Sequence, residues 1–213
     1  MKKSIKLLFW SFAIAIIAIF NTNAYFVDQA KVVSNVFATG TWPTGGVVIN
    51  EVYYDVDGNH GAEGGAQNDE WIELYNNSAS AVNLKNWSIT DNNNTVVINS
   101  DSSIPAYGFA LLSKSANTWG YWGINPGNPG IGIEIVVMGQ FNQFSNSGDR
   151  VILKDALGNV VDQMSYGTDN SIFLPACADV AEGHSLERSP KGHDTGLSID
   201  FINQANPTPG SGL

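Results

Sequence analysis

The stretch that decides the fold class is Asp69-Glu70-Trp71-Ile72-Glu73-Leu74-Tyr75-Asn76. Its side chains alternate, with Ile72 and Leu74 on one face and Trp71, Glu73 and Tyr75 on the other. A period of two residues indicates a β-strand that turns one face to a core, and polar residues from Asn76 onward end it. We therefore expect a strand here, with Ile72 and Leu74 pointing into the interior.

Further strands of this kind lie on both sides of the stretch. Runs rich in β-branched and aromatic residues are Val47–Tyr54, Val82–Thr90, Thr95–Ile98, Phe109–Ser113, Ile133–Met138, Arg150–Lys154 and Val160–Tyr166. In the first run, the spacing places Val48, Val52 and Tyr54 on a common face. Residues that favour turns separate the runs, as at Asp91-Asn92-Asn93-Asn94 and Leu157-Gly158-Asn159.

Short strands at this spacing, without a long run of helical period, predict an all-β antiparallel sandwich or barrel. The residues expected to form the core and its borders are Trp71, Trp87, Ile72, Leu74, Ile89, Val151 and Leu153.

The N-terminus has the form of a secretory signal peptide. Lys2, Lys3 and Lys6 precede an apolar run from Leu7 to Phe20, and small residues before Ala24 suit cleavage after it. The run is shorter than the roughly 20 residues that span a membrane core. We expect residues 1–24 to be a signal helix whose removal leaves no stable membrane span, with an uncleaved anchor as the alternative. Either way, the folded part would be secreted or extracytoplasmic.

The net charge and the cysteine content limit which binding partners and disulfides we expect. The net charge is −10, and loss of the three lysines within residues 1–24 would make it −13. A field of that sign repels phosphate backbones, so nucleic acid is not an expected partner. Cys177 is the single cysteine, so no disulfide can form within the chain. Burial as a small apolar residue, a free thiol and pairing between chains all stay open for it, with burial preferred.

A co-linear set of motifs takes the prediction further. In chain order the motifs are Val48–Val52, Asp69–Asn76, Val82–Asp91, Ile104–Phe109, Asn146–Leu153, Val160–Asp162, Gly183–Arg188 and Asn206–Gly210. Together they resemble the lamin tail domain family, in the form found in many exported bacterial proteins, from about residue 44 to residue 212.

The resemblance implies an immunoglobulin-like antiparallel β-sandwich with a binding or structural role. No catalytic residues carry over, and no cofactor is required. We place the sandwich at residues 44–213, after the signal peptide (1–24) and a leader segment (25–43). Two stretches depart from the family pattern: Thr118–Gly132 is an apparent insertion, and Asp169–Val180 is irregular.

The leader carries a second resemblance. Ala24–Asp28 and Ser34–Trp42 are similar to the start of biofilm-fibre and camelysin-type precursors. That similarity implies an N-terminal strand that self-associates with a neighbouring subunit through residues 25–42, because an exposed edge strand can pair with another chain. The alternative is an ordinary polar leader.

An oxygen-rich loop follows the Val47–Tyr54 run and suggests a calcium site. The candidate ligands are Asp55, Asp57, Asn59, Glu63 and Asp69. Calcium takes about six to eight oxygen ligands from such loops. The spacing begins like an EF-hand but departs from it, because Gly58 and His60 stand where that motif needs a different pattern. The alternative is a solvated acidic loop.

Other candidate chemistry is sparse. His60, His184 and His193 are scattered, so zinc is not expected. Glu51 and Glu73 would form a pair of carboxylates, which a glycosidase needs, if their strands were neighbours. We prefer the alternative in which these glutamates form ion pairs with Arg150 or Arg188.

Aromatic residues gather inside the apparent insertion. Trp119, Tyr121 and Trp122 would stack on a sugar or a partner protein, or else fold back over the open end of the sandwich.

Two functions of different class follow from the sequence. The first is a non-catalytic extracytoplasmic module that binds surface or matrix proteins or glycans, or builds structure at the cell surface. The second is an exported hydrolase, a glycosidase or a phosphoesterase, that uses paired carboxylates. A pocket with two facing carboxylates would favour the second.

Overall fold

The computed structural model describes residues 46–61, 69–140 and 144–213. Its strands are β1 (Val47–Tyr53), β2 (Trp71–Asn76), β3 (Val82–Asn83), β4 (Ser88–Thr90), β5 (Thr95–Val97), β6 (Ser103–Ile104), β7 (Phe109–Ser113), β8 (Ile133–Val137), β9 (Arg150–Lys154), β10 (Val160–Ser165), β11 (Ser185–Arg188) and β12 (Phe201–Gln204). Two short 3₁₀ helices, η1 (Ala116–Trp122) and η2 (Ser198–Asp200), complete the described elements.

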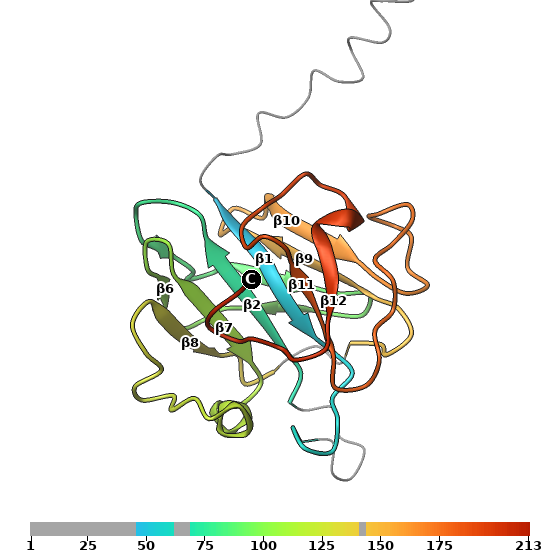
Figure 1. Cartoon of the computed structure of the whole chain (residues 1–213). Helices are drawn as coiled ribbons and strands as arrows, with labels where there is room; N and C mark the ends of the chain where they lie inside the picture. The colour runs from blue at the N-terminus through green and yellow to red at the C-terminus, as the bar shows by residue number, and fades with distance from the viewer. Residues whose placement is uncertain (1–45, 62–68, 141–143) are drawn as a thin grey trace, which may run out of the picture. The chain divides into compact units, whose positions relative to one another are not determined.

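The strands form a sandwich of two main sheets. A six-stranded sheet has the order β12-β11-β1-β2-β7-β8, and a four-stranded sheet has the order β10-β9-β4-β5 (Figure 1). A small third sheet pairs β3 with β6. One apolar cluster joins the facing sides of the main sheets, with Ile72 and Leu74 from the first and Ile89, Val151 and Leu153 from the second. The all-β immunoglobulin-like fold and its core are therefore confirmed, and Trp87 packs at the border of that cluster.

The six-stranded sheet is covered on its outer face as well. Trp71 packs there with Trp119 of η1, and Tyr75 packs with Val48 and Phe109. This double cover explains why every residue of β1, β2 and β7 is buried, including the polar ones.

The expected face of β1 is wrong in its first half. Val52 and Tyr54 lie in the main core, but Val48 lies on the outer face, and Ile49 takes the inner position. The cause is a β-bulge, because the pairing with β2 shifts register between Ile49 and Glu51. An extra residue in one strand inverts the alternation beyond it.

Side chains from distant parts of the chain form hydrogen bonds with the backbone at this bulge. The Ile49 N–H donates to Asp162 Oδ2 at 2.7 Å, and the Ile49 carbonyl accepts from Arg188 Nε at 3.0 Å. Both backbone groups are thus bonded to side chains, and the paired register of β1 with β11 includes only Glu51 and Val52 of β1.

Three parts of the chain differ from the expected strands. Val82–Thr90 is divided into β3 and β4 by a turn with Asn86 at a φ of 64°. The strands β11 and β12 were not expected. The pair β7–β8 is parallel, unlike the expected antiparallel pairing. A parallel pair requires a crossover of about a dozen residues, which the stretch Thr118–Gly132 supplies.

The irregular stretch Asp169–Val180 contributes an isolated bridge between Tyr166 and Cys177 rather than a strand. Cys177 is buried, as preferred, and burial raises the pKa of its thiol to about 12. The signal peptide, the leader segment and its proposed self-association all lie outside the described residues. Within the described part of the chain, no helix has the length and apolar character needed to cross a membrane.

Candidate functional site

A pocket of about 390 Å³ lies where three loop regions meet. The segment after β1 contributes Asp57 and His60, and η1 contributes Trp122. The third wall comes from the segments that flank β11 and β12, with Glu182 and Asn206 among its residues. Loops held by a rigid sandwich are frequent binding sites, so this pocket is the candidate functional site.

A tight turn brings the third wall close to the first. The Gly183 N–H donates to the Asp55 carbonyl at 2.7 Å. Gly183 has a φ of 82°, and a Cβ there would lie 3.1 Å from Asp57 Oδ2. Glycine therefore suits this position both for its backbone conformation and for the close approach to Asp57.

Aromatic stacking fixes one wall of the pocket. The rings of His60 and Trp122 lie 4.1 Å apart and are nearly parallel, at 13°. Tyr53 and Trp71 meet the Trp122 ring edge-on, at 5.2 and 5.5 Å. Such packing restrains Trp122 while leaving it partly exposed at the pocket.

The three aromatic residues expected to stack on a ligand have different environments. Trp119 is fully buried against Trp71, so it belongs to the outer cluster and not to a binding surface. Tyr121 is half exposed but does not line the pocket. Trp122 alone of the three lines it. A sequence cannot separate these rings, because the 3₁₀ turn that buries one and exposes another was not recognisable in a Gly/Pro-rich stretch.

Asp57 is held as a carboxylate inside the pocket. Its Oδ1 accepts from the His60 N–H at 3.0 Å and lies 2.5 Å from His60 Nδ1. Partial burial alone would raise the pKa of Asp57, but the hydrogen bonds and charge of His60 outweigh it, so the pKa lies below its ordinary value. The His60–Asp57 contact also orients the imidazole, as carboxylates generally do for histidine.

The expected calcium ligands do not converge in the described part of the chain. Asp55 accepts a hydrogen bond from Asn146, and Asp69 accepts one from Thr118 at 2.7 Å. Asn59 donates to Asp57 at 3.4 Å. Among the described residues, no group of three or more His, Cys, Asp or Glu side chains is placed to hold a metal ion. Glu63 lies outside those residues, so calcium binding by the loop stays a prediction.

The calcium hypothesis predicts a specific thermal shift. Calcium at about ten times its dissociation constant would stabilise the native state by about 1.4 kcal/mol, which raises the melting temperature by a few degrees. The double variant Asp55→Asn with Asp57→Asn would show no shift, and magnesium would act much more weakly on the wild type. Equal shifts with both ions, or in both proteins, would mean general screening of an acidic surface.

A row of buried glutamates crosses the outer face of the six-stranded sheet. Glu51 lies directly opposite Glu73 on β2 and Glu187 on β11. The strands β1 and β2 are therefore neighbours, which is the condition under which Glu51 and Glu73 were expected to form a pair of carboxylates. The preferred ion pairs with Arg150 or Arg188 are wrong, because both arginines pair with aspartates elsewhere.

The C-terminal segment supplies hydrogen-bond donors to these three glutamates. It runs across the face of the sheet in dark red in Figure 1. The Thr208 N–H donates to Glu51 at 3.2 Å, and the Gly210 N–H donates to Glu73 at 2.6 Å. Thr208 Oγ1 donates to Glu187 at 3.0 Å. The other donors are Asn50, Ser185 and Gln204. This row anchors the C-terminal segment and leaves no open carboxylate pair.

Burial predicts an unusual pH dependence of stability. Burial, and next the neighbouring Glu73, raises the pKa of Glu51, and burial raises that of Glu73 to about 8. A carboxyl group whose pKa is higher in the folded state than in the unfolded state costs no stability below its unfolded-state pKa. As the pH rises from there through its folded-state pKa, the folded state is progressively destabilised. We therefore expect the urea midpoint to be lower at pH 9 than at pH 6.

The matched variant is Glu73→Gln, which cannot ionise and should reduce this pH dependence. Glu70, whose pKa burial raises to about 9, contributes with the same sign and would keep part of it. Equal midpoints at pH 6 and pH 9 in the wild type would contradict the expectation.

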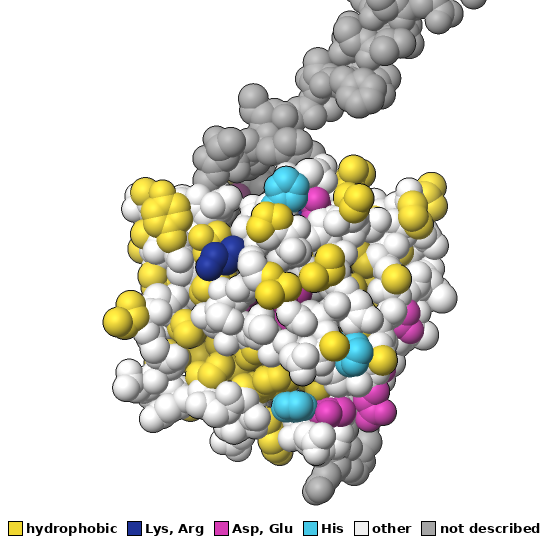
Figure 2. Space-filling view, in the orientation of Figure 1, with side chains coloured by type: hydrophobic (Ala, Val, Ile, Leu, Met, Phe, Trp, Pro, Cys, Tyr) yellow, Lys and Arg dark blue, Asp and Glu magenta, His cyan; other side chains and the backbone are white. Residues whose placement is uncertain are grey.

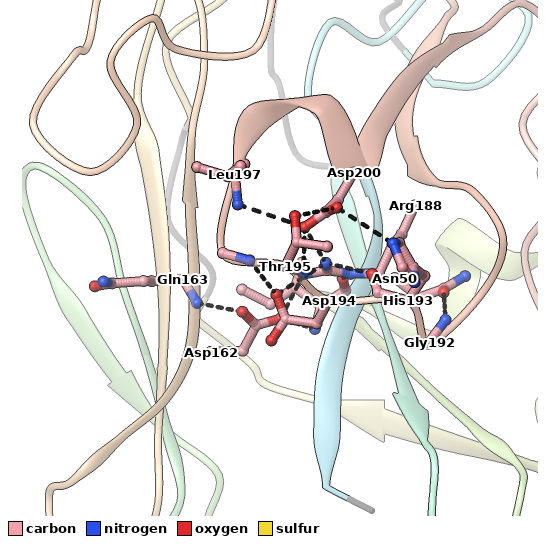
Figure 3. Close-up of polar contacts among 12 residues, drawn as sticks. Asn50, Asp162, Gln163, Arg188, Gly192, His193, Asp194, Thr195, Leu197 and Asp200 are labelled. Carbon is pink, nitrogen blue, oxygen red and sulfur yellow. Dashed lines mark hydrogen bonds and ion pairs between the residues drawn. The ribbon is translucent and has the colours of Figure 1, made fainter. Parts of the chain in front are cut away.

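Arg188 is the hub of a second buried cluster (Figure 3). Its Nη2 donates to Asp162 at 2.9 Å, and its Nη1 donates to Asp194 at 3.2 Å and to Asp200 at 3.3 Å. Its guanidinium lies 4.5 Å from the centre of the Phe201 ring. Since Asp162 belongs to β10 and Arg188 to β11, the contact joins the two main sheets, and we assign the cluster a structural role.

Two packed, mainly antiparallel sheets with a shared apolar core define an immunoglobulin-like β-sandwich module. The family model described as Lamin Tail Domain matches residues 41–168, and the chain belongs to this family. Lamin tail domains are immunoglobulin-like modules without enzymatic activity. None of the curated proteins matches the chain. The family match ends before β11 and β12, although both strands belong to the same six-stranded sheet.

Proposed function

We propose that this protein is an exported, non-catalytic binding module that acts at the cell surface or in the extracellular matrix. The observation that carries the proposal is the pocket at the end of β1, where Trp122 and several polar side chains meet. An aromatic wall beside fixed polar groups is typical of ligand sites. Surface or matrix proteins and glycans are the expected partners, and residues 1–24 support export by their sequence pattern.

The test is a pull-down from cell-surface extract with residues 25–213 as bait. We expect a partner that the wild type retains and that Trp122→Ala loses. The matched control is Tyr107→Ala, which removes an exposed aromatic ring that does not line the pocket. Melting temperatures of all baits should be compared first, since Trp122 also packs on Tyr53. Equal capture by wild type and Trp122→Ala would contradict the role of the pocket.

Treatment of the extract separates the partner classes. Loss of capture after proteolysis indicates a protein, and loss after periodate oxidation indicates a glycan. Self-association through residues 25–42 is a separate proposal, which a comparison of molecular mass with and without those residues decides.

Export with cleavage of the signal peptide is tested by a separate measurement. Mass spectrometry of the protein recovered outside the cytoplasm should find Tyr25 at the N-terminus. Met1 or Lys2 there would instead indicate an uncleaved anchor.

A hydrolase is the second candidate, because Asp57 and Glu182 line the same pocket. A glycosidase needs one of its two carboxyl groups as an acid with a raised pKa. The pKa of Asp57 is lowered, which suits a base or nucleophile but not that acid. Assays with aryl glycosides and aryl phosphates decide the matter: turnover that both Asp57→Asn and Glu182→Gln abolish would replace the binding proposal.

A further inference from the structure

The pocket lining contains two carboxylates and two histidines, His60 and His184, but no lysine or arginine. The carboxylates are those of Asp57 and Glu182. Two more carboxylates lie close by, since burial and then the charges of Glu182 and Asp179 raise the pKa of Asp55. Asp179 itself accepts a hydrogen bond from Tyr54 at 2.7 Å.

His60 contacts Asp57 within the pocket, whereas the lysine and arginine residues that form ion pairs in the described part of the chain pair with carboxylates outside the pocket lining. These pairs are Lys85–Asp101, Arg150–Asp169 and Arg188 with Asp162, Asp194 and Asp200. On the face drawn in Figure 2, histidine and acidic side chains lie together near the lower edge and again near the upper edge, and the dark-blue basic side chain lies toward the upper left. The potential at the pocket is therefore negative and attracts cations.

An aromatic ring stands beside these carboxylates. The Trp122 indole is held at the pocket by its stack with His60 and by its contacts with Tyr53 and Trp71. Indole is the aromatic side chain that attracts a cation most strongly, and the attraction grows when the cation loses part of its water. Glu182 is exposed and lines the same pocket as the ring.

The Nδ1 atoms of the two pocket histidines have partners within the protein, so only their Nε2 atoms could ligate a metal ion. His60 Nδ1 contacts Asp57, and His184 Nδ1 lies 2.8 Å from Asn203 Oδ1. Within the described residues no three metal-ligating side chains converge. A pocket of about 390 Å³ is also much larger than a single ion requires and accommodates an alkyl chain with a charged end.

We propose that this pocket binds an alkylammonium group, with Trp122 contacting the cation and its alkyl chain and with Asp57 and Glu182 supplying the opposite charge. The inference rests on the proposed binding function and names the ligand chemistry of the same site. The group would come from a lysine side chain of a partner protein or from a free amine.

The experiment is a titration of the protein with Nα-acetyl-lysine N-methylamide, followed by tryptophan fluorescence and by calorimetry. The neutral control probe is the norleucine analogue, which keeps the alkyl chain and lacks the charge. We expect the lysine probe to bind at least about tenfold more tightly, and a rise in salt from about 0.05 to 0.5 M to weaken it several-fold.

Matched variants assign the effect to residues. Glu182→Gln should weaken the lysine probe about five- to tenfold while leaving the melting temperature unchanged, since Glu182 is exposed. Glu134→Gln on β8 removes the same charge away from the pocket lining and should change the affinity less than twofold. Trp122→Ala should weaken both probes.

The outcomes separate this inference from the proposed function. Equal binding of the lysine and norleucine probes, or equal effects of Glu182→Gln and Glu134→Gln, would overturn the cation site. Binding of a neutral oligosaccharide that Trp122→Ala abolishes, without binding of the lysine probe, would overturn it while leaving the binding module intact. Tighter binding of a lysine peptide than of butylamine assigns the group to a protein partner, and the reverse order assigns it to a free amine.

Discussion

Replacing Arg188 with methionine is expected to lower the free energy of unfolding by about 3–5 kcal/mol at neutral pH. The guanidinium is fully buried and neutralises Asp162 and Asp200, which are buried as well. Removing one partner of a buried ion pair leaves the other charge without compensation, and this costs more than the pair itself contributed. Urea denaturation of the purified variant measures the loss.

The pH dependence of that loss distinguishes charge from packing. Burial raises the pKa of Asp162 to about 6, even though the charge of Arg188 acts to lower it. Without Arg188 the pKa rises further, so Asp162 is protonated and needs no counter-charge at low pH. We therefore expect a smaller loss at pH 5 than at pH 8.

The control for this variant is Arg150→Met. Arg150 is partly exposed, and its Nε lies 3.8 Å from Asp169 Oδ2, so its removal should cost less than about 1 kcal/mol. Similar losses for the two variants would show that the Arg188 cluster is not a buried ion pair in solution.

Leu74→Ala is the second variant with a large expected effect. Leu74 is fully buried on the inner face of β2, within the cluster that joins the two main sheets. Truncating such a residue removes apolar contacts and leaves a cavity, which costs about 2–5 kcal/mol and lowers the melting temperature by several degrees. Calorimetry of the variant beside the wild type measures this shift.

The matched control is Leu157→Ala, in the turn between β9 and β10. Leu157 is 88% exposed, so the same truncation there should change stability by about 0.5 kcal/mol or less. If Leu74→Ala melted within about one degree of the wild type, the inner face of β2 would be assigned wrongly.

Most strands could be located along the chain from the sequence because local signals define them. Alternation in β2 and the turn residues between strands depend on neighbours along the chain alone, and both predict an all-β sandwich. The facing of Ile72 and Leu74 followed from the same period and is confirmed. In contrast, β11 and β12 carry no clear alternation, because Glu187 and Arg188 are buried by specific polar partners rather than by apolar contacts.

The faces of β1 show why a local pattern is insufficient. The bulge after Ile49 coincides with hydrogen bonds to Asp162 and Arg188, residues more than a hundred positions away in the chain. No spacing within Val47–Tyr53 announces such contacts, so the period of two assigned Val48 to the wrong face. A β-bulge of this kind depends on the tertiary contacts that satisfy the displaced backbone groups.

The candidate site divides in the same way. The sequence by itself determined the fold class, the acidic loop with Asp57 and the aromatic group that contains Trp122. Only the tertiary structure decided which of those aromatic residues is accessible and that Glu182 lies beside Asp57. The physical reason is that burial, charge pairing and pocket shape arise between segments distant in the chain, whereas the strand pattern arises within each segment.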